Sequence, residues 1–124
     1  MVKVLYISSD SDNSIIEMEI DSNKKKVKLS KLIKQQENIT KFYPISYGSN
    51  MLKKNDQFIG IRLVGVFSKP GYYTDYNTIA SNIIGKQTFG PAVFALTDNG
   101  QYINFRKNML QHVTNIQEEE RYLI

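Results

Sequence analysis

The sequence predicts a single small α+β domain over residues 1–124: an antiparallel β-sheet with three short helices, the last an amphipathic helix at the C-terminus. Three observations predict this class. The chain has 124 residues, of which 41% are hydrophobic and 23% charged, which is ordinary for one domain with its own core. Several short runs alternate apolar with polar residues, as half-buried strands do. Other runs repeat apolar residues at helical spacing between turn signals.

The N-terminal part of the chain predicts a β-hairpin. Val2–Ile7 is rich in β-branched and aromatic residues, which favours a strand. Residues 16–20 alternate apolar side chains with Glu17 and Glu19, the pattern of a second, half-buried strand. The stretch between them is polar and provides the loop. We therefore expect the two strands to pair antiparallel with one face in water.

A helix and an edge strand are expected next. Residues 28–38 carry leucine and isoleucine at helical spacing, and Ser30 is placed to cap that helix. Residues 39–46 predict a strand, which Pro44 confines to an edge or a bend because proline donates no backbone hydrogen bond. Glycine, serine and asparagine then mark residues 47–56 as a loop.

Three further strands are predicted in the second half. Residues 57–67 form the most strand-like run of the chain, and residues 92–96 follow a Gly-Pro pair. The dipeptide Asn99-Gly100 separates residues 92–96 from residues 102–105, and it is a strong signal for a two-residue hairpin turn.

Two more helices complete the prediction. Thr74 or Asp75 is placed to cap a helix over residues 79–84, and Gly85 is placed to end it in the left-handed conformation. The last helix carries one apolar stripe. Its members are Met109, Leu110, Val113 and Ile116.

Composition argues against catalysis and for binding. The chain has no cysteine and one histidine, His112, so neither a cysteine nucleophile nor a Cys/His metal cluster is expected, and no cofactor motif is present. The first residues form too short an apolar stretch for a signal peptide or a membrane span, which favours the cytoplasm. Residues 24–55 hold nine lysines against one acid, Glu37. This balance of +8 suits a phosphate or an acidic partner, or equally a solvated face.

The candidate binding residues are aromatics and arginines. Phe67, Tyr73 and Tyr76 belong to an aromatic-rich stretch that ends at Asn77, and aromatic rings stack on nucleobases. These rings suit core packing as well. Arg62 lies within an apolar strand, where its guanidinium either is paired, faces a polar cavity or points into solvent.

The second half of the chain resembles small phage-encoded proteins, and within these the Thoeris anti-defence sponge proteins. The resemblance extends over about residues 57–106. The stretches that carry it are Asn77-Thr78-Ile79-Ala80-Ser81, Gly90-Pro91-Ala92-Val93-Phe94-Ala95-Leu96 and Asn99-Gly100. Phe67 and Asn77 match, in type and in their ten-residue spacing, that family's base-stacking aromatic and its asparagine. Arg62 and Arg106 are the counterparts of its phosphate-binding arginines.

The resemblance implies a protein that is not an enzyme. Such sponges bind a cyclic ADP-ribose-type signal of bacterial immunity and hold it without cleaving it. It also implies a homodimer or a higher homo-oligomer with the ligand site between protomers, for which the apolar stripe of the last helix is a candidate seam. The alternative is an inhibitor that binds nucleic acid or a nucleic-acid-dependent defence complex, in the manner of an anti-CRISPR protein, through the lysine-rich residues 24–55.

Overall fold

The first two strands pair as the sequence predicts. In the computed structural model, which describes residues 1–10, 14–21, 28–51 and 58–113, β1 (Val2–Ile7) and β2 (Ile15–Ile20) form an antiparallel hairpin. Val4 lies opposite Met18 in this register. Since side chains alternate between the faces of a strand, Ile16, Met18 and Ile20 share one face of β2, and Ile15 shares the other with the two glutamates.

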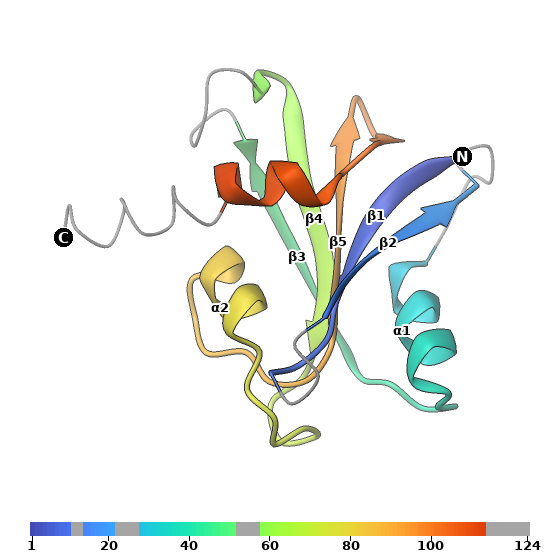
Figure 1. Ribbon diagram of the computed structural model, residues 1–124, viewed down its shortest axis with the longest axis vertical. Coiled ribbons are helices and arrows are strands. Elements are labelled where there is room, and N and C mark those ends of the chain that lie inside the picture. Colours follow the sequence, from blue (N-terminus) through green and yellow to red (C-terminus); the bar gives the residue numbers. More distant parts are fainter. Residues whose placement is uncertain (11–13, 22–27, 52–57, 114–124) are drawn as a thin grey trace, which may run out of the picture.

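The sheet has six antiparallel strands in the order β2-β1-β5-β4-β3, with β6 paired to β5 (Figure 1). The remaining strands are β3 (Pro44–Asn50), β4 (Ile61–Ser68), β5 (Ala92–Asp98) and β6 (Gln101–Ile103). Both central residues of the β5–β6 turn, Asn99 and Gly100, have positive φ, at 51° and 80°. This is what the two-residue hairpin requires. The predicted α+β class with an antiparallel sheet is confirmed.

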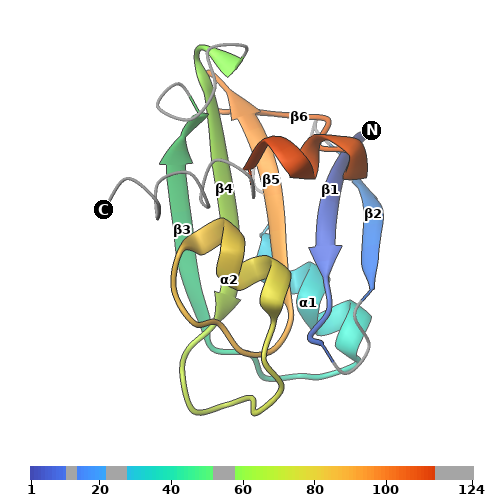
Figure 2. The same ribbon diagram turned by 60° about the vertical axis from the view of Figure 1, so that its left-hand side comes forward.

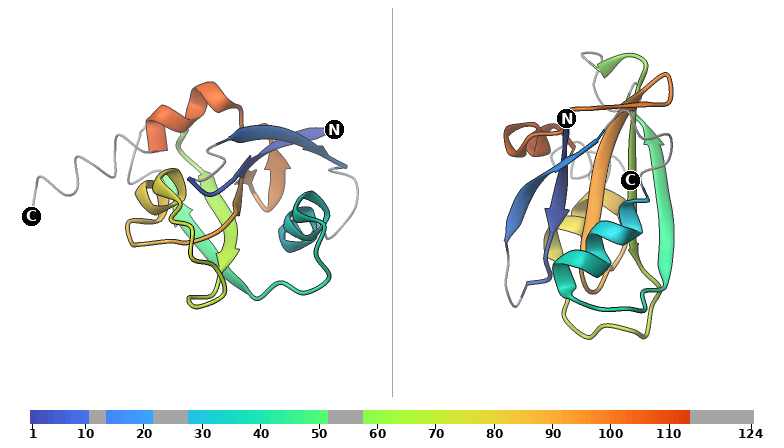
Figure 3. Two further views of the ribbon diagram at one scale, coloured as in Figure 1. Left: turned by 60° about the horizontal axis from the view of Figure 1, so that its bottom comes forward. Right: turned by 90° about the vertical axis from the view of Figure 1, so that its right-hand side faces the viewer.

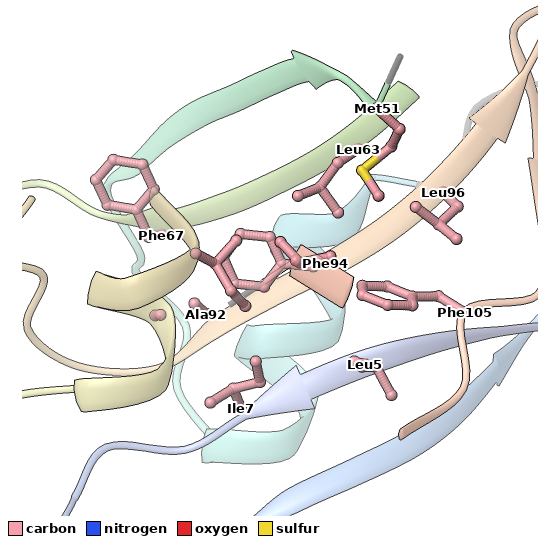
Figure 4. Packing of buried hydrophobic residues seen from close by; sticks show 12 residues of the cluster. Leu5, Ile7, Met51, Leu63, Phe67, Ala92, Phe94, Leu96 and Phe105 are labelled. Carbon is pink, nitrogen blue, oxygen red and sulfur yellow. The ribbon is translucent and has the colours of Figure 1, made fainter. Parts of the chain in front are cut away.

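Helices cover both faces of the sheet. The helix α1 (Leu29–Glu37) packs on one face, while α2 (Thr78–Ile84) and the helical segment after β6 pack on the other (Figures 2 and 3). Two clusters of buried side chains result, one for each face. We call these faces the α1 face and the α2 face. Figure 4 shows the α2-face cluster, with Phe94 at its centre between Phe67 and Phe105.

The helix ends differ from the predicted ones. Asn77 caps α2, because its Oδ1 accepts a hydrogen bond from the backbone N–H of Ala80 at 3.0 Å. The prediction of Thr74 or Asp75 at that position was therefore wrong, whereas Gly85 ends the helix as predicted, with φ of 88°. Ser30 lies inside α1 and caps nothing there, since α1 begins without a side-chain cap.

Strand β3 lies further along the chain than predicted. Residues 39–43 form no strand, and Pro44 is the first residue of β3, where its missing N–H is tolerated. Residues 47–50, predicted as loop, belong to β3 instead, because their backbone pairs with β4. Strand β4 begins only at Ile61, since Gly60 makes a turn with φ of 83°.

The apolar stripe near the C-terminus packs against the chain's own sheet. A 3-10 turn, η3 (Lys107–Met109), leads into a helical segment that the structure describes as far as Val113. Val113 is 1% exposed in the α2-face cluster, and Met109 and Leu110 pack against it. These three residues are therefore not a free dimer seam, and Ile116 lies outside the described residues. Within the described ranges, no helix is long and apolar enough to cross a membrane.

Candidate functional site

Phe67 belongs to the core of the α2 face rather than to an open binding surface. Its ring is 4% exposed and packs between β4 and α2 (Figure 4). The ammonium group of Lys86 lies 5.4 Å from the ring centroid, in cation–π contact. A small cleft of about 260 Å³ adjoins the ring, with Phe89 and Thr88 on its other walls. In this arrangement the ring has no free face on which a nucleobase could stack.

Asn77 is a structural residue in this fold. Its side chain is fully buried, and its Nδ2 group donates to the carbonyl oxygens of Ile7 at 3.2 Å and Gly90 at 2.8 Å. Its Oδ1 accepts from Ala80, as described above. Both amide protons and the amide oxygen are thus engaged within the chain. The expectation that this amide faces a ligand beside Phe67 is not met, because the amide instead joins β1, α2 and the segment before β5.

Tyr73 and Tyr76 lie before α2 and pack against the segment that leads from α2 to β5. Tyr73 packs against Gly90, where an added Cβ would lie 2.5 Å from the ring, and burial together with the charge of Glu37 raises the pKa of its phenol. Tyr76 is exposed and meets Phe89 edge-on, with the ring centroids 5.5 Å apart. Because Phe89 also lines the cleft beside Phe67, this segment connects Tyr76 with that cleft.

The two arginines lie away from Phe67. Arg62 is five residues before Phe67 on β4 and on the opposite face, which places it about 16 Å along the strand. Arg106 precedes η3, next to Phe105, whose N–H donates to the carbonyl oxygen of Lys3 on β1. The cation beside Phe67 is Lys86 instead. The predicted cleft of Phe67, Asn77 and a guanidinium is therefore not assembled.

A larger hollow lies on the α1 face, and we call it the sheet groove. Its volume is about 510 Å³, within the range of about 300–1,000 Å³ that is usual for small-ligand sites. The half-buried side chains of Val64 and Val66 belong to its lining, where α1 leaves part of the sheet uncovered. The other lining residues described are Lys28, Leu29, Ser46, Tyr47, Gly65, Thr97, Gly100 and Tyr102.

Arg62 borders this groove because position 48 is a glycine. A Cβ built on Gly48 would lie 2.3 Å from Nη2 of Arg62, so the guanidinium rests directly across the β3 backbone there. Gly48 pairs with Val64, which lines the groove. Among the described residues the recorded ion pair is Lys3 with Glu17, at 3.3 Å, and Arg62 has no carboxylate partner among them. The guanidinium thus lies next to the groove, without a carboxylate partner among the residues that the structure describes.

The polar groups of the groove are hydroxyls and cations. Ser46, Thr97 and Tyr102 contribute hydroxyls, and Lys28 contributes an ammonium group. Burial raises the pKa of the Tyr102 phenol, so it stays protonated at neutral pH. No Asp, Glu, His or Cys is found among the described residues of the lining. These described groups can bind an anion that carries an apolar ring.

The sequence indicated Arg62, at the border of this groove, as a binding residue, but none of the residues that line the groove. Arg62 was recognisable as a charge within an apolar strand. The lining comes from the start of α1, from four strands and from the β5–β6 turn, which are separated along the chain, and valine, serine and threonine on strands carry no motif.

No metal site accompanies the groove in the part of the chain that the structure describes, since no group of three or more His, Cys, Asp or Glu side chains lies close enough together. Comparison of the chain with protein-family models, with curated proteins and with solved structures finds no match in any of the three.

Proposed function

We propose that this chain binds a small, phosphorylated, nucleotide-derived ligand in the sheet groove and holds it without cleaving it. The observation that carries the proposal is the Arg62 guanidinium, held across Gly48 at the edge of an apolar hollow with no carboxylate partner among the described residues. A guanidinium binds two phosphate oxygens at once through its planar fork. A phosphate in the groove would thus find a guanidinium at the border of the groove.

The remaining lining matches the other parts of such a ligand. Val64 and Val66 offer apolar surface to a flat base, and the ring of Tyr102 offers a face for stacking. Ser46 and Thr97 offer hydroxyls to ribose, and Lys28 adds a second positive charge. The groove's volume of about 510 Å³ suits a ligand of nucleotide size.

The groove is better suited to binding the ligand than to hydrolysing it. A hydrolase needs a base or a metal to activate water, and neither is among the groove's described lining. The resemblance to phage Thoeris anti-defence sponges supplies a biological setting: sequestration of a cyclic ADP-ribose-type immune signal in the host cytoplasm. The proposed site then shifts from Phe67 and Asn77 to the sheet groove.

A second copy of the chain would complete the groove. Strand β3 forms its outer wall and pairs within the described sheet only with β4. Addition of a strand to such an edge is a common way for proteins to associate. We therefore propose a homodimer that pairs through β3 and encloses the ligand.

Titration calorimetry and native mass spectrometry with cyclic ADP-ribose and ADP-ribose test this proposal. Wild type should bind at least one of these probes, and Arg62→Gln should weaken binding about 10- to 100-fold, since it removes hydrogen bonds to a charged group. Arg106→Gln is the matched control, because it removes an exposed guanidinium away from the groove, and it should bind as wild type does.

Three results would refute the proposal. Failure of both probes to bind at millimolar concentration would show that the ligand is not of this nucleotide-derived class. Equal affinity of Arg62→Gln and Arg106→Gln would show that the ligand does not bind beside Arg62. A change in mass of the ligand released after denaturation would make the protein an enzyme rather than a sponge.

A further inference from the structure

Two exposed tyrosines stack on each other at one end of the sheet. Tyr43 lies just before β3 and Tyr72 lies between β4 and α2, in two connecting segments that run side by side at the lower end of the molecule (Figures 1 and 2). Their ring centroids are 4.2 Å apart and the ring planes are within 19° of parallel. They remain 41% and 54% exposed. Large aromatic rings that pack face to face yet stay this open present a flat π-surface to solvent.

A cleft of about 220 Å³ opens beside this pair, and we call it the tyrosine cleft. It has room for a single flat heterocycle, and most of its wall is aromatic. The residues that line it are Ile39, Lys41, Phe42, Tyr43, Tyr72 and Tyr73. Neither aspartate nor glutamate occurs among these described lining residues.

The walls of the tyrosine cleft are fixed before any ligand arrives. The N–H of Lys69 donates to the carbonyl oxygen of Tyr43 at 2.9 Å, which ties the two connecting segments together. Phe42 is buried in the α1-face cluster, and Tyr73 packs against it with ring centroids 6.5 Å apart. Binding to such a preorganised surface costs little conformational entropy.

Positive charge flanks the rings. Lys41 is exposed in the lining, and exposed Lys69 is hydrogen-bonded through its backbone to Tyr43. Glu37 opposes this charge, because it lies near enough to Tyr73 to raise its pKa, but its carboxylate accepts a hydrogen bond from the buried Tyr6 hydroxyl at 2.5 Å. Lys41 therefore lines the cleft and the backbone of exposed Lys69 adjoins Tyr43, while the Glu37 carboxylate is hydrogen-bonded to buried Tyr6.

We propose that the tyrosine cleft binds single-stranded nucleic acid, with one base in the cleft, a neighbouring base on the exposed tyrosine pair, and two phosphates adjoining these nucleotides on Lys41 and Lys69. Every nucleobase has a π-face, so stacking on tyrosine gives affinity with little sequence preference. A duplex is a poor ligand, because its bases are stacked on each other and cannot reach the rings. This site shares no lining residue with the sheet groove, so a test of one site does not decide the other.

Fluorescence anisotropy with labelled twelve-nucleotide oligo-dT and oligo-rA tests the proposal. Wild type should bind both, with log affinity falling against log salt with a slope of about −1.4, because each phosphate neutralised on a single strand contributes about −0.7. Lys41→Gln should reduce that slope to about −0.7. Tyr72→Ala should weaken binding about tenfold, whereas Tyr72→Phe, which keeps the ring, should bind as wild type does.

Two controls show whether a loss of binding comes from lost stacking rather than from unfolding or from the sheet groove. Tyr72 is more than half exposed, so Tyr72→Ala should unfold at the wild-type temperature. Arg62→Gln should leave oligonucleotide binding unchanged. Absence of oligonucleotide binding at 50 mM salt, equal affinity of Tyr72→Ala and wild type, or tight binding of a proline-rich peptide in place of the oligonucleotides would each overturn the inference.

Discussion

Single polar residues hold this molecule together at points where the apolar core is interrupted. Asn77 is the strongest case, since its fully buried amide bonds to two carbonyl oxygens and one helix N–H, from β1, α2 and the segment before β5. A buried amide of this kind is stabilising only while all its partners are in place, because each orphaned buried group costs about 1–3 kcal/mol.

The substitution Asn77→Ala should lower the free energy of unfolding by about 2–4 kcal/mol. It removes the cap of α2 and takes the Asn77 donor away from the carbonyl oxygens of Ile7 and Gly90. Urea unfolding followed by circular dichroism measures this loss. Asn108→Ala, on the exposed turn η3, should cost almost nothing and serves as control. Wild-type stability of Asn77→Ala would contradict the structural role assigned to this residue.

The substitution Gly48→Ala tests the position of the Arg62 guanidinium without removing it. The φ of Gly48 is not in the positive range, so alanine fits the backbone, but its Cβ would meet Nη2 of Arg62 at 2.3 Å and displace it. Stability should change by less than about 1 kcal/mol. Affinity for the nucleotide probe should fall about tenfold by calorimetry. In an Arg62→Gln background the same change should have no further effect, and an additive effect would argue against coupling of the two positions.

At the scale of elements, the sequence predicts best those helices and strands that end at a residue with positive φ. The β5–β6 hairpin was predictable because Asn99 and Gly100 adopt positive φ with little strain, and α2 was predictable because Gly85 ends it. Strand β3 was misplaced because Gly48 and Asn50 resemble loop residues. Only the pairing with β4, which is a long-range contact, makes that segment a strand.

The start of α2 should be sensitive to acid. The side-chain and backbone hydrogen bonds from Thr78 lower the pKa of Asp10. A lowered pKa in the folded state means that the stabilisation is present above the ordinary aspartate value of about 3.9 and is lost as the pH falls through the folded-state value. Asp10→Asn should therefore reduce stability at pH 5 and make the further loss between pH 5 and pH 2 smaller.

Urea unfolding at a series of pH values measures that difference. Asp98→Asn, on the exposed end of β5, is the matched control and should follow the wild-type curve. Glu17 adds to the loss of stability in acid in wild type and in both variants. The backbone N–H of Lys107 and then the Lys3 ammonium lower its pKa. A curve for Asp10→Asn that runs parallel to that of wild type would show that this carboxylate has no such role.

At the scale of the whole molecule, the two faces of the sheet are covered unequally. On the α2 face, α2 and the segment after β6 enclose the cluster around Phe94. On the α1 face, one helix of nine residues covers part of the sheet and leaves the sheet groove beside Val64 and Val66. The sequence could predict the class of the fold from its periodicities, but the groove is produced by this unequal coverage, which no local pattern records.

The position of β1 in the sheet has a consequence for synthesis of the chain on the ribosome. β1 lies between β2, its hairpin partner, and β5, which is translated much later. One edge of β1 therefore stays without its neighbour, and its apolar side chains stay accessible to chaperones, until Ala92–Asp98 has left the exit tunnel. The sheet is thus completed only after β5 has been synthesised, and a pause in elongation before β5 prolongs the interval in which the nascent hairpin can pair with another chain.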